Sequence, residues 1–392
     1  MKKLSKIDLW IVIPYILLLG IGIVMVYSAS FYNSLMAGGS TTQYLFKQAI
    51  FAVLGLLLCF FVFILKVKVF RSKRVVKILL WFAIASLIIV IGIGIAAPST
   101  KVNGASAWIP LGFFNYQPLE LAKLALILYL AFVLSSKQQR LLDHHDIKSV
   151  AFEITPPILF VLLMMVLLMA QPDFGGALVL AVITLVLLAA STIPGKYIFT
   201  LSTSLIVLLI AGISLVFKFA PTIITSKYQY QRFLAMQHPF ELEQKSGAQL
   251  VNSFYAISNG GIFGVGLGNG IQKRGYLPEP HTDFILAVIS EELGLVGDIV
   301  VLGLLAIIII RIVQLGIRAR KNYSSLVYYG VATMLLSQTV LNVGGLLGLI
   351  PLTGVTLPFI SYGGSSMLIL SMALGIVLNL EATRRFEIMK KG

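Results

Sequence analysis

The sequence predicts an all-α polytopic membrane protein with about ten transmembrane helices. Hydrophobic residues make up 58% of the 392-residue chain and charged residues only 11%, whereas soluble domains carry about 25% charged residues. Apolar runs of about 18 or more residues recur along the whole length, which is typical of transmembrane helices. A β-barrel would show short segments of alternating hydrophobicity instead. We therefore treat residues 1–392 as a single ten-span membrane domain.

The apolar runs locate the expected spans in order along the chain. The first begins near Asp8 and is long enough to cross a bilayer, so we interpret it as a helix rather than as a cleaved leader. Cys59, the one cysteine, lies in the second span, where we expect a small buried hydrophobic side chain and no intramolecular disulfide. The expected spans are 8–30, 44–65, 76–96, 118–136, 154–171, 176–193, 197–219, 284–310, 324–345 and 364–383.

Lysine and arginine residues determine the expected orientation of these spans. With a cytoplasmic N-terminus, 21 of the 30 Lys and Arg residues fall on the cytoplasmic side, whereas the four short outside loops hold only Lys101. Because short cytoplasmic loops carry the excess of Lys and Arg, both termini are predicted to be cytoplasmic. The net charge of +15 then reflects topology and contact with anionic membrane lipids rather than nucleic-acid binding.

A long extracellular loop, residues 220–283, precedes the eighth span. Loops of this length inside a compact protein are usually functional or disordered. This one contains aromatic residues, the apolar stretch "AQLVNSFYAIS" and the glycine-rich run "NGGIFGVGLGNG", so it is not of low complexity. We expect it to fold back onto the membrane surface, in part as an interfacial or re-entrant helix, and to carry the catalytic region.

Few ionisable residues interrupt the spans, and each costs about 2.5–3.5 kcal/mol on insertion scales, so each is a candidate functional residue. Glu120 and Lys123 lie three apart on one face of the fourth span, either as a neutralised pair that joins helices or as the wall of an outside-facing cavity. Asp173 lies in the turn "QPDFGG" between two spans. It is either a helix cap or part of the same site.

Asp283 follows "PEPHT" at the expected start of the eighth span. The structural interpretation is an N-terminal helix cap. The functional interpretation is a partly desolvated carboxylate that acts as a general base towards a sugar hydroxyl. Glu279 and His281 are close enough in sequence to orient this carboxylate or to share a metal ion with it, although a histidine in a proline-rich turn is more often structural.

Two further charged pairs flank Asp283 along the chain. Lys273 and Arg274 are either a solvated basic pair or the cations that bind an anionic leaving group such as pyrophosphate. Glu291 and Glu292 lie about 12 Å deeper along a helix, at 1.5 Å per residue. We therefore expect these two glutamates to support the scaffold rather than to contact the substrate of Asp283.

Several long motifs resemble the SEDS family, named for shape, elongation, division and sporulation. They are "NGGIFGVGLGNGIQKRGYLPEPHTDFILAVISEELG", "LTGVTLPFISYGGSS", "GASAWIPLGFFNYQPLELAK", "VYSAS" and "QPDFG". The resemblance covers the whole chain in order, with the same ten-span layout. The stretch "GVGLGNGIQKRGYLPEPHTDF" is closer to the division-type branch (FtsW) than to the elongation-type branch (RodA).

The resemblance implies a peptidoglycan glycosyltransferase that polymerises lipid II on the outer face of the bacterial cell membrane. By this resemblance Asp283 matches the catalytic aspartate, Trp108 the essential loop tryptophan, and Gln117, Glu120 and Lys123 the polar motif that faces the cavity. The family often has a basic residue just before the tryptophan, whereas Ser106 and Ala107 stand there in this chain. We also assign Asp173, Lys273, Arg274, Glu279, His281, Tyr362 and Ser365 to the substrate-binding site.

The resemblance also implies partners. These are lipid II with the nascent glycan strand, a class B penicillin-binding protein that acts as the transpeptidase, and other membrane proteins of the divisome or elongasome. A divalent cation, Mg²⁺ or Mn²⁺, is a candidate cofactor. The alternatives are a lipid II flippase, which would need polar residues in the cytoplasmic half, and a scaffold that only recruits the transpeptidase.

Overall fold

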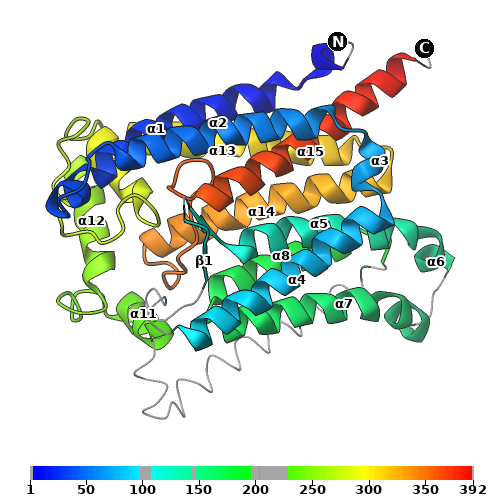
Figure 1. Cartoon of the computed structure of the whole chain (residues 1–392), viewed down its shortest axis with the longest axis horizontal. Coiled ribbons are helices and arrows are strands. Elements are labelled where there is room, and N and C mark those ends of the chain that lie inside the picture. Colours follow the sequence, from blue (N-terminus) through cyan, green and yellow to red (C-terminus); the bar gives the residue numbers. More distant parts are fainter. Residues whose placement is uncertain are drawn as a thin grey trace.

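The computed structural model describes residues 3–97, 107–112, 114–143, 147–193 and 228–390, with the single positions 195 and 203. Within these residues, eight helices are long and apolar enough to cross a membrane, and they lie alongside one another in one bundle (Figure 1). They are α1 (Leu9–Met36), α2 (Gln43–Ile64), α4 (Lys73–Ala96), α5 (Pro118–Ser136), α7 (Ile147–Ala170), α13 (Ile285–Ile317), α14 (Asn322–Leu346) and α15 (Gly364–Met389).

A shorter apolar helix, α8 (Phe174–Ala189), corresponds to the sixth expected span. Nine of the ten expected spans therefore appear as helices, which confirms the predicted all-α membrane architecture. The seventh expected span, 197–219, lies outside the described residues apart from position 203. The start of the long loop, 220–227, also lies outside them.

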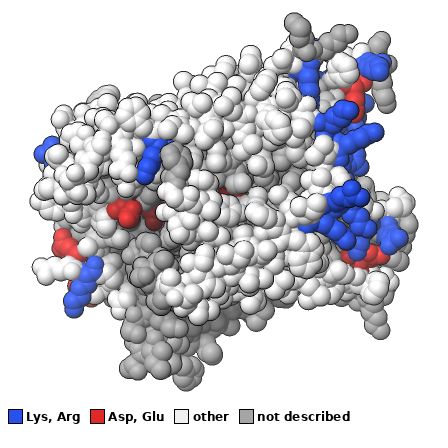
Figure 2. Space-filling model, in the orientation of Figure 1, with Lys and Arg blue, Asp and Glu red and all other residues white. Residues whose placement is uncertain are grey.

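Both termini lie at one end of the bundle, which we call the basic end (Figure 1). The short elements η1 (Leu4–Lys6), α3 (Val67–Phe70) and α6 (Gln138–Asp143) lie at this end. Figure 2 shows that Lys and Arg side chains gather there on the visible face. In the segment 66–77 every basic residue is exposed: Lys66, Lys68, Arg71, Lys73, Arg74 and Lys77. This distribution agrees with the predicted orientation, in which this end faces the cytoplasm.

The opposite end, which we call the site end, carries the long loop before α13 and the segment before α5 (Figure 1). The long loop before α13 contains two helices, α11 (Tyr228–Gln237) and α12 (Ala248–Gly260), so the helix expected from "AQLVNSFYAIS" forms. Helix α12 packs against α13. Before α5, the two-residue strands β1 (Ile109–Pro110) and β2 (Asn115–Tyr116) pair antiparallel.

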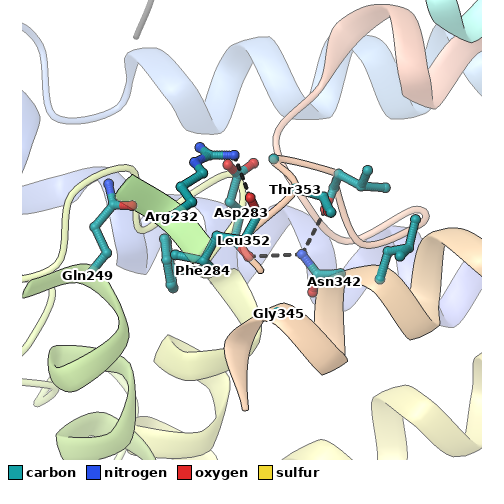
Figure 3. Close-up of a pocket in the computed structure, with 11 residues that line it drawn as sticks. Arg232, Gln249, Asp283, Phe284, Asn342, Gly345, Leu352 and Thr353 are labelled. Atoms are coloured by element: carbon teal, nitrogen blue, oxygen red, sulfur yellow. Dashed lines mark hydrogen bonds between the residues drawn. The ribbon is translucent and has the colours of Figure 1, made fainter. Parts of the chain in front are cut away.

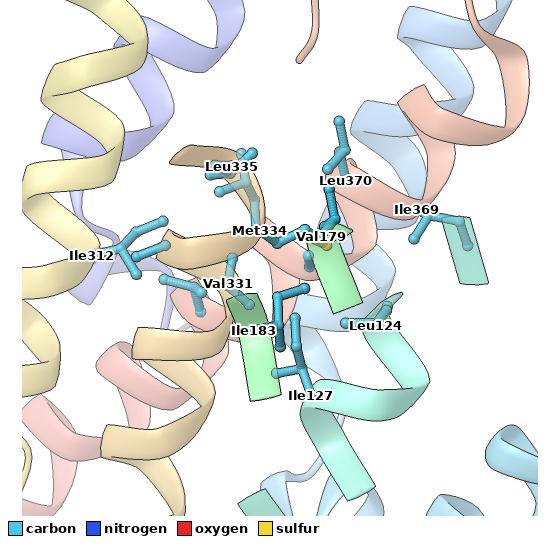
Figure 4. Packing of buried hydrophobic residues seen from close by; sticks show 14 of the residues in the cluster. Leu124, Ile127, Val179, Ile183, Ile312, Val331, Met334, Leu335, Ile369 and Leu370 are labelled. Carbon is cyan, nitrogen blue, oxygen red and sulfur yellow. The ribbon is translucent and has the colours of Figure 1, made fainter. Parts of the chain in front are cut away.

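Helix α5 occupies the centre of the bundle, where its apolar side chains interlock with those of α8, α14 and α15 (Figure 4). Leu124 and Ile127 of α5 are fully buried. Glycine allows close approach in this core, because a Cβ at Gly330 of α14 would lie 2.6 Å from Ile127 Cγ2. Small residues at such contacts are typical of transmembrane helix packing. The packed centre gives α5 a fixed position, from which its polar N-terminus projects to the site end.

Candidate active site

Asp283 is held in place through the backbone around it. Ser361 Oγ donates a hydrogen bond of 2.7 Å to the Thr282 carbonyl, and the Tyr362 N–H donates one of 2.8 Å to the His281 carbonyl. Asn342 Nδ2 donates one of 2.9 Å to the carbonyl of Asp283 itself. Three consecutive carbonyl groups are therefore fixed by α14 and by the loop between α14 and α15. The Asp283 side chain lies just before α13 and makes no cap for that helix.

The Asp283 side chain lines a hollow at the site end (Figure 3). The hollow is bounded by α11, α12, α14 and the segment 352–356, which belongs to the loop between α14 and α15. The residues that line it are Arg232, Gln249, Asp283, Phe284, Leu341, Asn342, Gly345, Leu352, Thr353, Gly354 and Val355. We call this hollow the Asp283 pocket.

Arg232 of α11 is the cation beside Asp283. A Cβ built on Gly354 would lie 3.6 Å from Asp283 Oδ2 and 3.7 Å from Arg232 Nη1, so both groups meet at this glycine. Gly354 has a positive φ of 73°, which L side chains rarely adopt. Arg232 Nη1 also donates a hydrogen bond of 2.7 Å to the Leu352 carbonyl (Figure 3). Because glycine adopts this conformation without strain, the 352–356 segment can pass close to the carboxylate and the guanidinium.

The protonation state of Asp283 is set by opposing effects. Asp283 keeps some solvent exposure, yet desolvation by the protein around it raises its pKa to about 6. The positive charge of Arg232 opposes this rise, and the negative charge of Glu279 adds to it. A carboxylate whose pKa is near 6 is mostly ionised at neutral pH and accepts a proton more readily than an ordinary aspartate.

A second hollow adjoins the first, and we call it the Glu120 pocket. Gly354 and Val355 line both hollows, so the 352–356 segment is their common wall. The Glu120 pocket is lined by Gln117, Leu119, Glu120, Lys123, Asp173, Gly176, Val179, Gly354, Val355 and Thr356. The structure therefore brings four of the expected site residues together and sets them beside Asp283.

Glu120 and Lys123 form a buried ion pair in the Glu120 pocket, with 2.8 Å between Lys123 Nζ and Glu120 Oε1. Glu120 Oε2 has no hydrogen-bond partner within the described part of the chain. Asp173 caps α8 by accepting a 2.7 Å hydrogen bond from the Gly176 N–H. Burial raises the pKa of Asp173, which the hydrogen bond from Gly176 and the charge of Lys123 oppose. Asp173 thus both caps α8 and lines the pocket, whereas Glu120 and Lys123 pair with each other within α5 and line the same pocket.

His281 lies in an aromatic cluster next to Asp283. Its ring centroid is 4.5 Å from that of Tyr44 and 5.6 Å from that of Tyr362. Burial lowers the pKa of His281 to about 4, so the imidazole is neutral near pH 7. Glu279 is exposed, and its carboxylate lies 4.0 Å from His281 Nε2. The histidine therefore packs the turn that carries Asp283, as expected for a structural residue.

The remaining expected site residues lie outside the linings of these two hollows. Lys273 is buried and forms an ion pair with Glu292 together with a 2.7 Å hydrogen bond to Ser28 Oγ. The positive charge of Lys273 is therefore paired with a carboxylate inside the protein. Arg274 is exposed. Ser365 Oγ accepts a 3.2 Å hydrogen bond from the Gln117 N–H, which ties α15 to the start of α5.

Trp108 directly precedes β1 and is 37% exposed. The adjoining positions 98–106, which include Ser106, lie outside the described residues. Strand β2 packs on α15, so the hairpin is anchored near the Ser365–Gln117 contact.

Glu291 and Glu292 anchor the glycine-rich loop that follows α12. Glu291 accepts hydrogen bonds from the N–H groups of Ile271 (2.9 Å) and Gln272 (3.1 Å), and Glu292 accepts one from the Gly268 N–H (3.0 Å). Both glutamates are fully buried. These contacts agree with the expected supporting role.

Helix α13 breaks at Gly294, where φ is 67°. The broken turn bonds to the glycine-rich loop, with the Val265 N–H donating to the Glu291 carbonyl (2.9 Å) and the Leu295 N–H to the Gly261 carbonyl (3.0 Å). A Cβ at Gly264 would lie 2.2 Å from the Glu292 carbonyl oxygen. Non-helical backbone at this depth is tolerated because other protein groups satisfy it.

Arg232 and Asn342 are two of the residues of the Asp283 pocket that the sequence did not reveal. Arg232 is one of five basic residues of the long loop, residues 220–283, and nothing in its local pattern distinguishes it. Asn342 is a polar residue in a span, and this was an available signal, because polar groups inside spans are costly unless they have partners.

The donor groups near Asp283 do not form a metal cage. Among the described residues, no three His, Cys, Asp or Glu side chains come together in a way that could hold a metal ion. A divalent cation at this site would take most of its ligands from phosphate oxygens of a substrate, as Mg²⁺ commonly does.

Known proteins match this chain over nearly its whole length. The family model of FtsW, RodA and SpoVE, described as "Cell cycle protein", matches residues 9–386. The chain is 36% identical over 397 residues to the "Probable peptidoglycan glycosyltransferase FtsW" of Bacillus subtilis (strain 168), covering 100% of this chain and 94% of that protein. It is 34% identical over 386 residues to "Stage V sporulation protein E" of the same organism, covering 98% and 99%.

Solved structures share the fold. One is a chain of a peptidoglycan synthase complex, studied for the structural coordination of polymerization and crosslinking, with a TM-score of 0.72, 29% identity, and coverage of 96% of this chain and 98% of that chain. Another is the rod shape determining protein RodA of Thermus thermophilus, with a TM-score of 0.67, 27% identity, and coverage of 96% and 97%.

Proposed function

Because the chain belongs to the FtsW/RodA/SpoVE family of cell cycle proteins, we propose that it is a peptidoglycan glycosyltransferase of the division-type branch, with Asp283 as general base. The single observation that carries the assignment of Asp283 is its setting. It is a partly exposed carboxylate with a pKa near 6, beside Arg232, in a pocket next to Glu120, Lys123 and Asp173.

The proposed reaction is a single inverting displacement. Asp283 takes the proton from the 4-hydroxyl of the GlcNAc of lipid II, the acceptor, and that oxygen attacks the anomeric carbon of the terminal MurNAc of the growing chain. The α-linked undecaprenyl pyrophosphate leaves with the bonding electron pair, and a β-1,4 bond forms. A positioned base of this kind contributes about 10²–10⁴ in rate.

Arg232 is the cation that we assign to the leaving pyrophosphate. Its guanidinium lies at the Asp283 pocket, and a planar fork of donors suits phosphate oxygens. Lys273 is paired with Glu292, and neither Lys273 nor Arg274 lines the two pockets, so we assign the role first expected of these two residues to Arg232. Glu120, Lys123 and Asp173 would bind polar groups of the second substrate across the 352–356 segment. A divalent cation, Mg²⁺ or Mn²⁺, would bind the pyrophosphate together with Arg232, and no step above depends on it.

We place the site end on the outer face of the cell membrane. The basic end carries both termini and the exposed residues of segment 66–77, and such basic loops mark the cytoplasmic side. The partner would be a class B penicillin-binding protein that crosslinks the new strands, because a solved relative belongs to a complex that couples polymerization to crosslinking. Other divisome or elongasome membrane proteins would join the same assembly.

A polymerisation assay tests this proposal. Purified protein with its transpeptidase partner is incubated with labelled lipid II, and glycan strands are separated by length. We expect strands from the wild type and loss of strands with Asp283→Asn, which keeps the side-chain shape and removes the base. A lipid II flippase or a scaffold would make no strands under any condition, and near-wild-type polymerisation by a folded Asp283→Asn variant would refute the assignment. The same assay with a chelator tests the divalent cation.

A further inference from the structure

Two buried polar atoms of the Asp283 pocket have no partner within the described part of the chain. They are Asn342 Oδ1 and Thr353 Oγ1. Both residues line the pocket, and Asn342 is 5% exposed. Buried polar groups in native proteins are nearly always hydrogen-bonded, so two such atoms beside one hollow require an explanation.

The orientation of the Asn342 amide follows from its partners. Its Nδ2 group lies 2.9 Å from the Asp283 carbonyl oxygen and 2.9 Å from the Val355 carbonyl oxygen (Figure 3). Carbonyl oxygens only accept hydrogen bonds, so the nitrogen must be on this side and the oxygen on the other. Asn342 thus joins the Asp283 backbone to the wall between the two pockets, and its Oδ1 atom has no hydrogen-bond partner in the described part of the chain.

A second asparagine, remote from the Asp283 pocket, also donates from its Nδ2 group to two backbone carbonyl oxygens. Asn379 of α15, near the basic end, is also buried and donates from Nδ2 to the carbonyls of Val62 (2.7 Å) and Leu65 (2.9 Å). There, however, Lys3 Nζ donates a 2.7 Å hydrogen bond to Asn379 Oδ1. The amide oxygen of Asn379 therefore has a donor, whereas that of Asn342, beside Asp283, has none within the described residues.

We propose that Asn342 Oδ1 and Thr353 Oγ1 bind a sugar hydroxyl that neighbours the reacting hydroxyl of the acceptor. An amide oxygen only accepts and a threonine hydroxyl can donate, so the pair matches a group that does both. On the acceptor GlcNAc, the hydroxyl groups that flank position 4 are those at carbons 3 and 6. This contact aligns the 4-hydroxyl with Asp283, and it rests on the proposed function.

The test compares variants on three acceptors: lipid II, and lipid II whose GlcNAc lacks the 3-hydroxyl or the 6-hydroxyl. Thr353→Val keeps the side-chain shape and removes only the hydroxyl. We expect it to lower kcat/KM for lipid II about tenfold, which is about 1.4 kcal/mol, and to cause much less loss on one of the two deoxy acceptors. Asn342→Ala should also lower kcat/KM less on that same deoxy acceptor than on lipid II. It should cause, in addition, a loss of kcat/KM that is equal on all three acceptors.

Asn379→Ala is the matched control, and any loss it causes should be equal on all three acceptors. Equal losses on all three acceptors for both Thr353→Val and Asn342→Ala would overturn the proposal, as would a wild type that uses both deoxy acceptors as well as lipid II. Failure of the proposed function has a different signature, because then the wild type makes no polymer or Asp283→Asn matches it.

Discussion

Asp283 and the pair Glu291–Glu292 lie within ten residues of one another, yet the protein surrounds them in opposite ways. The two glutamates are fully buried, and backbone N–H groups of the glycine-rich loop, Asn259, Ser28 and Lys273 occupy their oxygens. Asp283 keeps partial exposure, faces Arg232 and lines a pocket. Acids whose hydrogen bonds are met by the fold serve as anchors, whereas an acid left open to a pocket is available for chemistry.

The largest effect on the anchoring side is expected from Glu292→Ala. This change leaves Lys273 buried without a counter-charge, and breaking a buried ion pair in this way costs about 3–5 kcal/mol. The midpoint of unfolding in detergent measures the loss. A Glu292→Leu/Lys273→Met double variant removes both charges and should regain part of that stability. A Glu292→Ala protein as stable as the wild type would contradict the anchoring role.

A smaller loss of stability is expected from Gly264→Ala. The added Cβ would meet the Glu292 carbonyl, at 2.2 Å, in a backbone with φ of 78°. The backbone costs about 1–2 kcal/mol and the overlap a further about 1–3 kcal/mol. Gly268→Ala is the matched control, because its φ is 84° but nothing lies within 4 Å of the added Cβ. Equal unfolding midpoints for the two variants would show that the loop does not pack tightly on α13.

The smallest effect is a displacement of the pH profile, and it tests the chemical side of the comparison. The rate of polymerisation should fall as pH drops through about 6, because the base must be ionised. Arg232 holds the pKa of Asp283 down and Glu279 raises it, so Arg232→Gln should move the acid limb to higher pH and Glu279→Gln to lower pH. Initial rates between about pH 5 and 8 measure both shifts. Shifts in the same direction, or none, would contradict this account of the site.

The spans could be predicted from the sequence because each apolar run satisfies its own requirement for a lipid-crossing helix. The supporting role of Glu291 and Glu292 could also be predicted, since their depth along a helix follows from sequence distance alone. Sequence distance did not predict which basic residue lies beside Asp283. Lys273 is ten residues from Asp283, but its side chain pairs with Glu292, whereas Arg232 reaches Asp283 from a helix 51 residues earlier.

The common wall between the two pockets was also beyond the sequence. It depends on Gly354 passing beside Asp283 and on Asn342 binding both Asp283 and Val355. These contacts join residues far apart in the chain and arise only when α14, α15 and the long loop have packed together. The motif around Ser365 identified the region, but it did not reveal that Gly354 and Thr353 contribute to the site.

The roles of Asp283 as base and Glu292 as anchor are tested most directly by a paired measurement on Asp283→Asn and Glu292→Gln, in which polymerisation rate and unfolding midpoint are recorded for each purified protein. We expect Asp283→Asn to unfold as the wild type does but to lose about 10²–10⁴ in rate. We expect Glu292→Gln to lose stability and, while folded, to keep far more of the rate. A folded Asp283→Asn protein that polymerises lipid II at nearly the wild-type rate would contradict the claim that Asp283 is the base.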